Sequence, residues 1–319
     1  MRVLIIGANG FVGKALVHRF LDSRSLLKRA VSKLLLFDQS PLDYEIPDWA
    51  KHYCGDLGEP ALLRRVLADG IDLVFHLASV AGGLAEQDYE LGYRVNLQGT
   101  LELLQQLRQK PNRPTFVYTS SIAVYGGSLP TSMEEDYQPR PELSYATHKL
   151  MIELMLRDLS RRGELDGRSL RVPGIVVRPS RGNGLKSAFM SDLINAMAQG
   201  KTYECPVSSQ ASMWWMSARC CVDNLVHAAD VSAVTSAGTW QLPALHLTIG
   251  EVINALAERF GEQSRSLIRF APDESLEALF GCYPPMETPL ARAEGFYHDG
   301  DAKNLVENVL TPEKELNYV

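Results

Sequence analysis

Short runs of apolar residues alternate with helix-length amphipathic stretches through the first half of the chain. Such runs, separated by helices, are typical of parallel strands buried on both faces of a sheet. The pattern predicts an α/β fold with a Rossmann-type, doubly wound parallel sheet, because the right-handed crossover rule leaves few other arrangements. The expected strands are residues 3–6, 34–37, 52–54, 73–77, 115–119 and 169–177, and the expected helices are residues 11–21, 61–68, 88–109 and 143–161.

The pattern changes at about residue 179. Short helices, expected at residues 189–198, 249–260 and 274–280, are separated there by stretches rich in Pro, Gly and Ser. We therefore expect a Rossmann domain over residues 1–178 and a smaller, mixed substrate-binding domain over residues 179–319. The segment from about residue 220 to 245 is expected to rejoin the first domain.

A glycine-rich turn follows the first expected strand directly and opens a helix. Glycines at such positions allow a tight turn, a close approach of the backbone to a pyrophosphate, and close packing of the helix on the strand. The N-terminus of the helix offers free N–H groups and a partial positive charge to the phosphates. A purely structural turn is the alternative. The candidate dinucleotide-binding residues here are Gly7, Asn9, Gly10, Phe11, Val12 and Gly13.

Residues at the ends of the next expected strands strengthen the dinucleotide interpretation. Asp38 ends the second strand, where a carboxylate hydrogen-bonds ribose hydroxyls and repels a 2′-phosphate, so that NAD is favoured over NADP. Asp56 and Leu57 follow the third strand and suit an adenine. The fourth strand ends at the carboxyl edge, where open sheets bind ligands, in three more candidates: Leu77, Ala78 and Ser79.

Tyr145 and Lys149 lie four residues apart, on one face of an expected helix. A free Tyr has a pKa of about 10, too high for a base at neutral pH, and a fixed cation nearby lowers it. A shift of about three pKa units corresponds to about 4 kcal/mol, which Lys149 and an oxidised nicotinamide would supply together. The pair is therefore a candidate for hydride-transfer chemistry. An exposed helix pair without a catalytic role is the alternative.

Two further residues give this pair its context. Ser121, which we prefer to Ser120, places a hydroxyl at the end of the fifth strand. Asn96 lies in the long preceding helix, where its polar side chain would brace the site. A helix–helix hydrogen bond is the alternative role for Asn96.

Together these residues resemble the extended short-chain dehydrogenase/reductase family, also called the NAD-dependent epimerase/dehydratase family. The resemblance covers roughly residues 1–245 and rests on the glycine turn, Asp38, residues 55–57, residues 76–78, Asn96, Ser121 and the Tyr145/Lys149 pair. It implies NAD as cofactor and Tyr145 as general acid/base. It also implies that Ser121 polarises the reacting C–O group, that Lys149 binds the nicotinamide ribose and lowers the pKa of Tyr145, and that Pro179 belongs to the cofactor site.

The sequence departs from the members of this family that act on nucleotide sugars. Ser217 replaces the arginine that clamps their substrate diphosphate. Residues 81–93, 171–179 and 205–208 instead resemble a narrower group, which oxidises the C2 hydroxyl of a four-carbon sugar acid with NAD. A small carboxylate substrate needs a cationic partner, for which Arg181, Lys186 and Arg219 are candidates. Solvated surface charge is the alternative for each.

The leading hypothesis is therefore NAD-dependent oxidation of a small sugar acid, with Tyr145 as base and Ser121 holding the substrate oxygen. A nucleotide-sugar 4-epimerase is the first alternative, and a non-catalytic NAD(H)-sensing protein is an alternative from another class. Residues 214–216, two tryptophans and a methionine, form either a half-buried strand or a cover over the substrate. The leucine stripes at positions 97, 101, 104, 150 and 154 are expected to pack on the sheet, and the family resemblance implies a homodimer through the same two helices.

Composition and charge exclude several other partners. The 319 residues carry a net charge of −6, without a basic footprint for nucleic acid or an anionic membrane. The five cysteines have no C-x-x-C spacing and the seven histidines do not cluster, so we expect neither a metal site nor a disulfide framework. The first apolar run is too short for a signal peptide, and no run reaches the ~18 apolar residues of a membrane span. We expect a cytoplasmic protein with reduced thiols.

Overall fold

The computed structural model describes residues 1–26, 29–178, 187–231 and 238–311. Within these residues, seven parallel strands form one sheet in the order β12-β8-β7-β6-β1-β4-β5. This is the doubly wound α/β architecture that the sequence predicts. The strands of the sheet are β1 (Arg2–Ile6), β4 (Lys33–Asp38), β5 (Ala50–Cys54), β6 (Leu73–His76), β7 (Thr115–Ser121), β8 (Asp166–Val172) and β12 (Thr239–Gln241).

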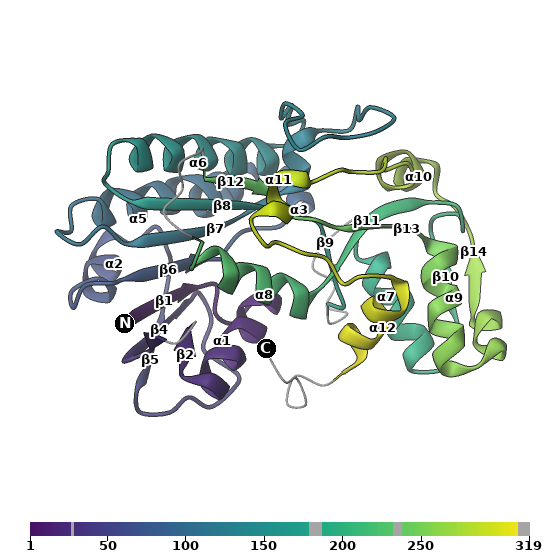
Figure 1. Cartoon of the computed structure of the whole chain (residues 1–319), viewed down its shortest axis with the longest axis horizontal. Coiled ribbons are helices and arrows are strands. Elements are labelled where there is room, and N and C mark those ends of the chain that lie inside the picture. Colours follow the sequence, from purple (N-terminus) through teal and green to yellow (C-terminus); the bar gives the residue numbers. More distant parts are fainter. Residues whose placement is uncertain (27–28, 179–186, 232–237, 312–319) are drawn as a thin grey trace.

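Helices cover both faces of this sheet (Figure 1). On one face lie α1 (Phe11–Ser23) and α8 (Ala218–Ala228), and on the other lie α2 (Pro60–Val66), α5 (Gly99–Leu107) and α6 (Ser144–Arg161). Alternate residues of β1 enter the two cores, because successive side chains of a strand point to opposite faces. Val3 and Ile5 pack with α1 and α8, whereas Leu4 and Ile6 pack with the other three helices.

The expected helix over residues 88–109 is a continuous helical segment that contains one π-helical stretch. It consists of α4 (Tyr89–Gly92), the π-helical residues Tyr93–Gln98 and α5, and it follows the short helix α3 (Gly82–Gln87). Asn96 lies within the π-helical part and is buried. π-Helical turns insert one extra residue and occur frequently at functional sites.

The prediction of one continuous strand over residues 169–177 is wrong, because the chain passes from one sheet to another within this range. β8 ends at Val172, and after Pro173 the chain continues as β9 (Gly174–Val176) in a second sheet of order β13-β11-β9. Proline has no backbone N–H to donate to a sheet ladder, so the central sheet is not extended through this position. This crossing carries the chain from the large sheet into the smaller part of the molecule.

The smaller part lies at one end of the large sheet and has its own apolar core (Figure 1). Three of its helices have the predicted bounds: α7 (Phe189–Ala198), α9 (Ile249–Phe260) and α10 (Glu274–Phe280). The described residues also include a pair of two-residue antiparallel strands in the first half of the chain, and 3-10 turns at Ile122–Tyr125 and Glu262–Leu267. The strands and helices whose bounds have not yet been given are β2 (Ser25–Leu26), β3 (Arg29–Ala30), β10 (Tyr203–Cys205), β11 (Ser212–Ser217), β13 (Leu245–Thr248), β14 (Ile268–Phe270), α11 (Pro289–Ala293) and α12 (Ala302–Leu310).

After β11 the chain returns to the large sheet. α8 packs against α1, and β12 pairs with β8 at the edge of the sheet, with Trp240 opposite Leu170. The division into two domains at residue 178 stays a prediction. The structure shows that α8 packs on one face of the large sheet and that β12 forms one edge of it.

The tryptophans at positions 214 and 215 neither form a half-buried strand nor cover a pocket. Both lie in β11 with only 1% and 0% of their surface exposed. The indole N–H of Trp214 donates to the Pro284 carbonyl at 2.7 Å, and that of Trp215 donates to the Leu247 carbonyl at 3.0 Å. The two side chains point to opposite faces of β11: Trp214 packs with Val124, Tyr125 and Met133, and Trp215 packs in the apolar core of the smaller part.

One leucine of the two predicted stripes points away from the sheet. Leu97 and Leu104 are buried as expected, but Leu154 on α6 is 46% exposed. Met151 and Met155, on the same side of α6, are also exposed. The outer face of α6 is therefore apolar and open in the single chain.

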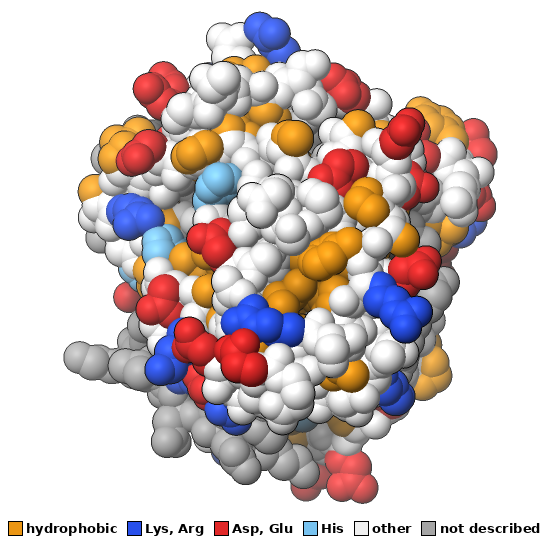
Figure 2. Space-filling view, turned by 90° about the vertical axis from the view of Figure 1, so that its right-hand side faces the viewer, with side chains coloured by type: hydrophobic (Ala, Val, Ile, Leu, Met, Phe, Trp, Pro, Cys, Tyr) orange, Lys and Arg blue, Asp and Glu red, His pale blue; other side chains and the backbone are white. Residues whose placement is uncertain are grey.

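Positive and negative side chains are mixed on the visible surface of the smaller part. Seen from that end, Lys and Arg side chains are interspersed with Asp and Glu, and hydrophobic side chains gather in a hollow near the middle of the face (Figure 2). Among the described residues, no helix has the length and apolar character needed to span a membrane.

Candidate active site

The carboxyl ends of the parallel strands bring the candidate residues to one edge of the sheet. The turn after β1 contacts the segment that follows β6: the N–H groups of Leu77 and Ala78 both donate to the Ile6 carbonyl, at 2.8 and 3.0 Å. The turn also meets the end of β4, because the N–H of Gly7 donates to the Phe37 carbonyl at 2.8 Å. Residues predicted from separate strands are thus neighbours in space.

The glycine turn has the geometry that a dinucleotide requires. Gly7 has φ +88°, and a Cβ there would lie 2.7 Å from the Ala78 nitrogen. A Cβ at Gly13 would lie 1.9 Å from the Gly7 carbonyl oxygen, so only glycine allows the helix to approach the strand this closely. Gly10 precedes α1 and supplies no side-chain cap. The first N–H groups of α1, at Phe11, Val12 and Gly13, therefore remain available for phosphate oxygens.

Asp38 stands beside this turn, at the end of β4. Its carboxylate accepts hydrogen bonds from the Asn9 N–H at 2.9 Å and from the Ser40 hydroxyl at 3.0 Å. The Asn9 amide nitrogen donates to the Ser40 hydroxyl and to the Pro41 carbonyl, whereas its Oδ1 is buried without a hydrogen-bond partner among the described residues. A fixed carboxylate and an unsatisfied buried oxygen fit a ligand that brings hydroxyl and N–H donors.

Asn96 acts on the segment after β6 rather than on another helix. Its Oδ1 accepts from the Val80 N–H at 2.7 Å, and its amide nitrogen donates to the Val80 carbonyl at 3.0 Å. The pair of bonds fixes the backbone next to Ser79. Asn96 is thus placed to position this segment, and its direct contact with the cofactor stays a prediction.

Asp56 and Leu57 are held at the other side of the cofactor edge. The Asp56 carboxylate accepts from the Gly58 N–H at 2.8 Å and pairs with Arg94 at 3.6 Å. Leu57 is buried, and its side chain lies against Gly99. Their predicted contact with the adenine stays untested, and their local bonds define the turn on which it would depend.

Tyr145 lies in the first turn of α6 and faces the ends of β6 and β7. The backbone of Gly82 lies against its ring, since a Cβ added there would be 3.7 Å from the Tyr145 Cδ1. Burial raises the pKa of Tyr145, whereas hydrogen bonds with Ser121 and Ser79 and the charge of Arg178 lower it. Burial is the largest effect, so the pKa of Tyr145 lies above its usual value, and the three groups that favour the phenolate offset this shift in part.

Lys149 lies one turn further along α6 and is almost completely buried. Its ammonium donates to the Thr119 carbonyl at 2.7 Å and lies 5.6 Å from the centre of the Tyr145 ring. Burial lowers the pKa of Lys149 to about 7, and the negative charge of Glu153 opposes this shift. The ammonium is therefore positioned under the Tyr145 ring. The nicotinamide-ribose role of Lys149 stays a prediction.

The two serines at the end of β7 point in opposite directions, as alternation along a strand requires. Ser121 faces Tyr145, and its hydroxyl accepts from the Ala123 N–H at 3.1 Å. The hydroxyl of Ser120 is buried and donates to Glu153. Glu153 also pairs with Arg171 at 2.8 Å, so that a buried ionic network lies behind the site.

The three predicted cations give different results. Arg181 and Lys186, like Pro179 of the cofactor prediction, lie outside the described residues. Arg219 lies in the first turn of α8. Burial raises the pKa values of Asp223 and Tyr297, and the charge of Arg219 opposes both shifts in part.

Sequence reasoning missed Arg178. Its guanidinium carbon lies 5.8 Å from the centre of the Phe11 ring, and its charge acts on Tyr145. The available signal was its position directly before Pro179, in a segment already singled out by resemblance.

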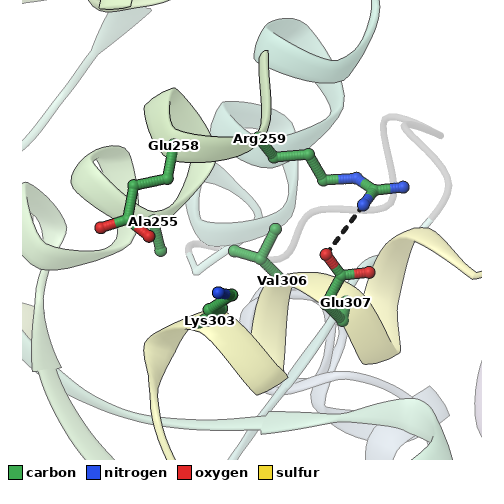
Figure 3. Close-up of a pocket in the computed structure, with 6 residues that line it drawn as sticks. All are labelled: Ala255, Glu258, Arg259, Lys303, Val306 and Glu307. Atoms are coloured by element: carbon green, nitrogen blue, oxygen red, sulfur yellow. Dashed lines mark hydrogen bonds and ion pairs between the residues drawn. The ribbon is translucent and has the colours of Figure 1, made fainter. Parts of the chain in front are cut away.

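A separate pocket of about 280 Å³ lies between α9 and α12, away from this edge. Figure 3 shows Arg259 of α9 and Glu307 of α12 joined across it, at 2.8 Å. Its lining is otherwise Ala255, Glu258, Lys303 and Val306, and it contains none of the predicted site residues.

The site therefore combines a dinucleotide turn with a Tyr-Lys-Ser set at one sheet edge, which defines an NAD-dependent oxidoreductase. Residues 3–240 match the NAD dependent epimerase/dehydratase family, and the chain belongs to this family. This confirms the family resemblance and NAD as the cofactor.

Among individual proteins, the chain is similar to two D-erythronate dehydrogenases. It is 34% identical to the one from Cupriavidus necator over 313 residues, which covers 96% of this chain and 97% of the relative. It is 30% identical to the one from Haemophilus influenzae, which covers 97% of this chain and 99% of the relative. A crystal structure described as a nucleoside-diphosphate-sugar epimerase from Agrobacterium tumefaciens superposes with a TM-score of 0.88 at 33% identity, over 96% of this chain and 92% of that one.

Proposed function

We propose that this protein is an NAD-dependent dehydrogenase that oxidises the C2 hydroxyl of D-erythronate to 2-oxo-D-erythronate. The observation that carries the proposal is the contact of Tyr145 with Ser121 and Ser79 at the sheet edge, next to a glycine turn fitted to NAD. The similarity to two D-erythronate dehydrogenases over almost the whole chain supports the choice of substrate.

The side chains divide the chemistry between a proton and a hydride. The Tyr145 phenolate takes the proton of the C2 hydroxyl, and the Ser121 hydroxyl donates a hydrogen bond to the same oxygen as the carbonyl forms. NAD, when bound, accepts the hydride from C2. The charge of Arg178 favours the ionised form of Tyr145, and the Lys149 ammonium lies 5.6 Å from the centre of the Tyr145 ring. The C2 carbon loses a hydride and its oxygen loses a proton, which leaves the 2-oxo acid.

A nucleotide-sugar 4-epimerase is the alternative that the Agrobacterium structure brings forward. Ser217, at the position of the diphosphate arginine, argues against it. Its surface is completely buried, its hydroxyl donates to Asp299 at 2.5 Å, and it caps α8 by accepting from the Cys220 N–H at 3.0 Å. A buried capping serine supplies no positive charge for a diphosphate.

Substrate screening tests the proposal directly. We expect D-erythronate and NAD to give NADH, measured as absorbance at 340 nm, in a panel of four- to six-carbon sugar acids. UDP-glucose and UDP-galactose should neither react nor inhibit at millimolar concentration. Competition by a UDP-sugar at micromolar concentration would replace the dehydrogenase with the epimerase. Micromolar NADH binding without turnover of any sugar acid would instead favour an NAD(H)-sensing protein.

Asp38 should determine the choice between NAD and NADP. Asp38→Ser removes the repulsion between the carboxylate and a 2′-phosphate, so the ratio of kcat/KM for NADP to that for NAD should rise by at least tenfold. Asp43→Ser, a change of an exposed acid that pairs with Lys14, serves as the control and should leave the ratio unchanged. A wild-type enzyme that already prefers NADP would show that Asp38 does not face the ribose.

We further propose a cytoplasmic homodimer that associates through the outer face of α6. Support comes from the exposed apolar side chains Met151, Leu154 and Met155, together with Tyr89 and Tyr93 beside them, around His148. An apolar face of this kind is stabilised when a second copy covers it. All five cysteines are free thiols, which suits a reducing compartment.

A further inference from the structure

Arg178 lies where three parts of the site meet. It follows β9, and its guanidinium carbon stacks 5.8 Å from the centre of the Phe11 ring, at the start of α1. The charge of Arg178 acts on Tyr145 of α6 and on Cys221 of α8. The side chain therefore lies against the start of α1, within electrostatic range of the predicted base and of the returning helix α8.

The backbone around Arg178 holds it in place. Its own N–H donates to the Ser191 hydroxyl at 3.0 Å, and its carbonyl accepts from the Asn195 amide at 3.1 Å. The Nε–H donates to the Ile175 carbonyl at 3.3 Å. Two side chains of α7 thus hold the backbone of Arg178, and the Ile175 carbonyl of β9 fixes the direction of its guanidinium.

The guanidinium lacks an acidic partner in the described part of the chain. Its two terminal nitrogens make no hydrogen bond or ion pair with the described residues, and neither nitrogen is completely buried without a partner. The side chain is nevertheless partly buried, and burial lowers its pKa. By contrast, Arg171 pairs with Glu153 and Arg168 pairs with Asp166. A partly buried cation without a counter-ion is stabilised when an anionic ligand supplies one.

We propose that Arg178 binds the carboxylate of the substrate, in place of the arginines suggested by the sequence. This inference rests on the proposed function, because the carboxylate of a 2-hydroxy acid is attached to the carbon that Tyr145 serves. A cation for that carboxylate must lie on the same side of the site as the base. The Arg178 guanidinium lies against Phe11 at the cofactor edge, and its charge favours the ionised form of Tyr145. The planar guanidinium offers two parallel N–H donors to a carboxylate.

The NAD pyrophosphate is the competing anion for Arg178. The glycine turn already provides that group with the N–H groups at the start of α1. Arg219 is the competing cation, and its charge acts on Asp223 and Tyr297. The two competitors make different predictions, which allows one set of variants to separate them.

Arg178→Gln and Arg178→Lys test the assignment. Two quantities are measured: kcat and KM for the sugar acid, and the Kd values of NADH and of the sugar acid in the enzyme–NADH complex, by nucleotide fluorescence. Arg178→Gln should lower kcat/KM for the sugar acid by about 30-fold or more, mainly through KM, and leave NADH binding within about threefold. Arg178→Lys should recover part of the loss, because it keeps the charge and loses the two-donor geometry.

The pH profile gives a second readout. We expect the oxidation rate to rise with pH as Tyr145 loses its proton. Because the charge of Arg178 favours the phenolate, its removal should raise the pKa of Tyr145. The acid limb of the kcat profile should therefore shift to higher pH in Arg178→Gln and return toward the wild-type position in Arg178→Lys. Arg269→Gln, an exposed arginine on β14, is the matched control and should change neither quantity.

Other results would contradict either the assignment of Arg178 or the proposed function. An equal loss of NADH and sugar-acid binding in Arg178→Gln would assign Arg178 to the pyrophosphate. A loss of sugar-acid binding in Arg219→Gln, with none in Arg178→Gln, would assign the carboxylate to Arg219. If wild-type enzyme neither binds nor oxidises any sugar acid, the proposed function fails and this inference fails with it. If wild-type enzyme oxidises sugar acids and Arg178→Gln is indistinguishable from it, only the inference fails.

Discussion

Tyr145→Phe lowers kcat for sugar-acid oxidation by roughly 10²–10⁴-fold and leaves the Kd for NADH within about twofold of the wild-type value. The phenylalanine ring still packs against the backbone of Gly82, so the helix start and the cofactor edge keep their structure. What is lost is the oxygen that Ser121 and Ser79 contact, and with it the acceptor for the substrate proton. Steady-state kinetics with saturating NAD and fluorescence titration with NADH measure the two quantities.

A matched tyrosine controls for this substitution. Tyr203→Phe changes a half-buried tyrosine of β10 in the smaller part of the molecule and should keep kcat and NADH binding unchanged. In wild-type enzyme the rate rises with pH as Tyr145 ionises, and the residual activity of Tyr145→Phe should lack this rise. A Tyr145→Phe variant with kcat within threefold of wild type would remove Tyr145 from the role of base.

Glu153→Leu lowers the free energy of unfolding by about 3–5 kcal/mol, because it leaves the Arg171 guanidinium buried without its counter-charge. The Glu153 and Arg171 side chains are only 4% and 11% exposed, and their shortest ion-pair distance is 2.8 Å. Arg171 also donates to the Tyr125 hydroxyl at 3.1 Å, and Glu153 accepts from Ser120. Replacing one partner therefore disturbs a network of four side chains. Urea denaturation followed by circular dichroism measures the loss.

The double variant separates loss of the pair from loss of one partner. Glu153→Leu combined with Arg171→Met removes both charges, and replacement of a buried pair by apolar residues of similar volume is often neutral. It should recover most of the stability lost in Glu153→Leu. Glu307→Gln breaks the exposed pair with Arg259, whose side chains are 45% and 46% exposed, and should cost less than about 1 kcal/mol. A Glu153→Leu variant no less stable than Glu307→Gln would contradict the importance of the network.

The sequence alone determined the order of the elements and the main residues of the site. The period of apolar residues and the glycine and proline positions are local signals, so they predicted the doubly wound sheet and the bounds of helices such as Phe189–Ala198 and Ile249–Phe260. Fixed spacing is also local, which is why the turn from Gly7 to Gly13 and the Tyr145/Lys149 pair were visible without a structure. The sequence also led to Ser121 rather than Ser120, and the structure explains the difference: side chains alternate along β7, so Ser121 faces Tyr145 while Ser120 bonds Glu153.

Features that depend on contacts between distant residues were decided only by the tertiary structure. Trp215 looked half-buried by its own strand, but both faces of that strand are covered. Trp215 packs in the apolar core of the smaller part, and Trp214, on the opposite face, packs with Val124 and Tyr125. Leu154 matched the apolar stripe of α6, yet the face of α6 that packs on the sheet is the one with Ile152 and Leu156. Leu154 lies on the opposite face, which is exposed in the single chain. Periodicity records which residues share a face and says nothing about what covers that face.

The charged residues show the same limit most clearly. Glu153 and Arg171 are 18 positions apart and on different elements, and only the packing of α6 on β8 makes them a buried pair. The charge of Arg178 acts on Tyr145 because the chain leaves the large sheet at Pro173, and the pairing of β9 with β11, a strand much further along the chain, sets its path from there. The environment of a charge is set by the burial and the charges that the fold assembles around it, and these come from all parts of the chain.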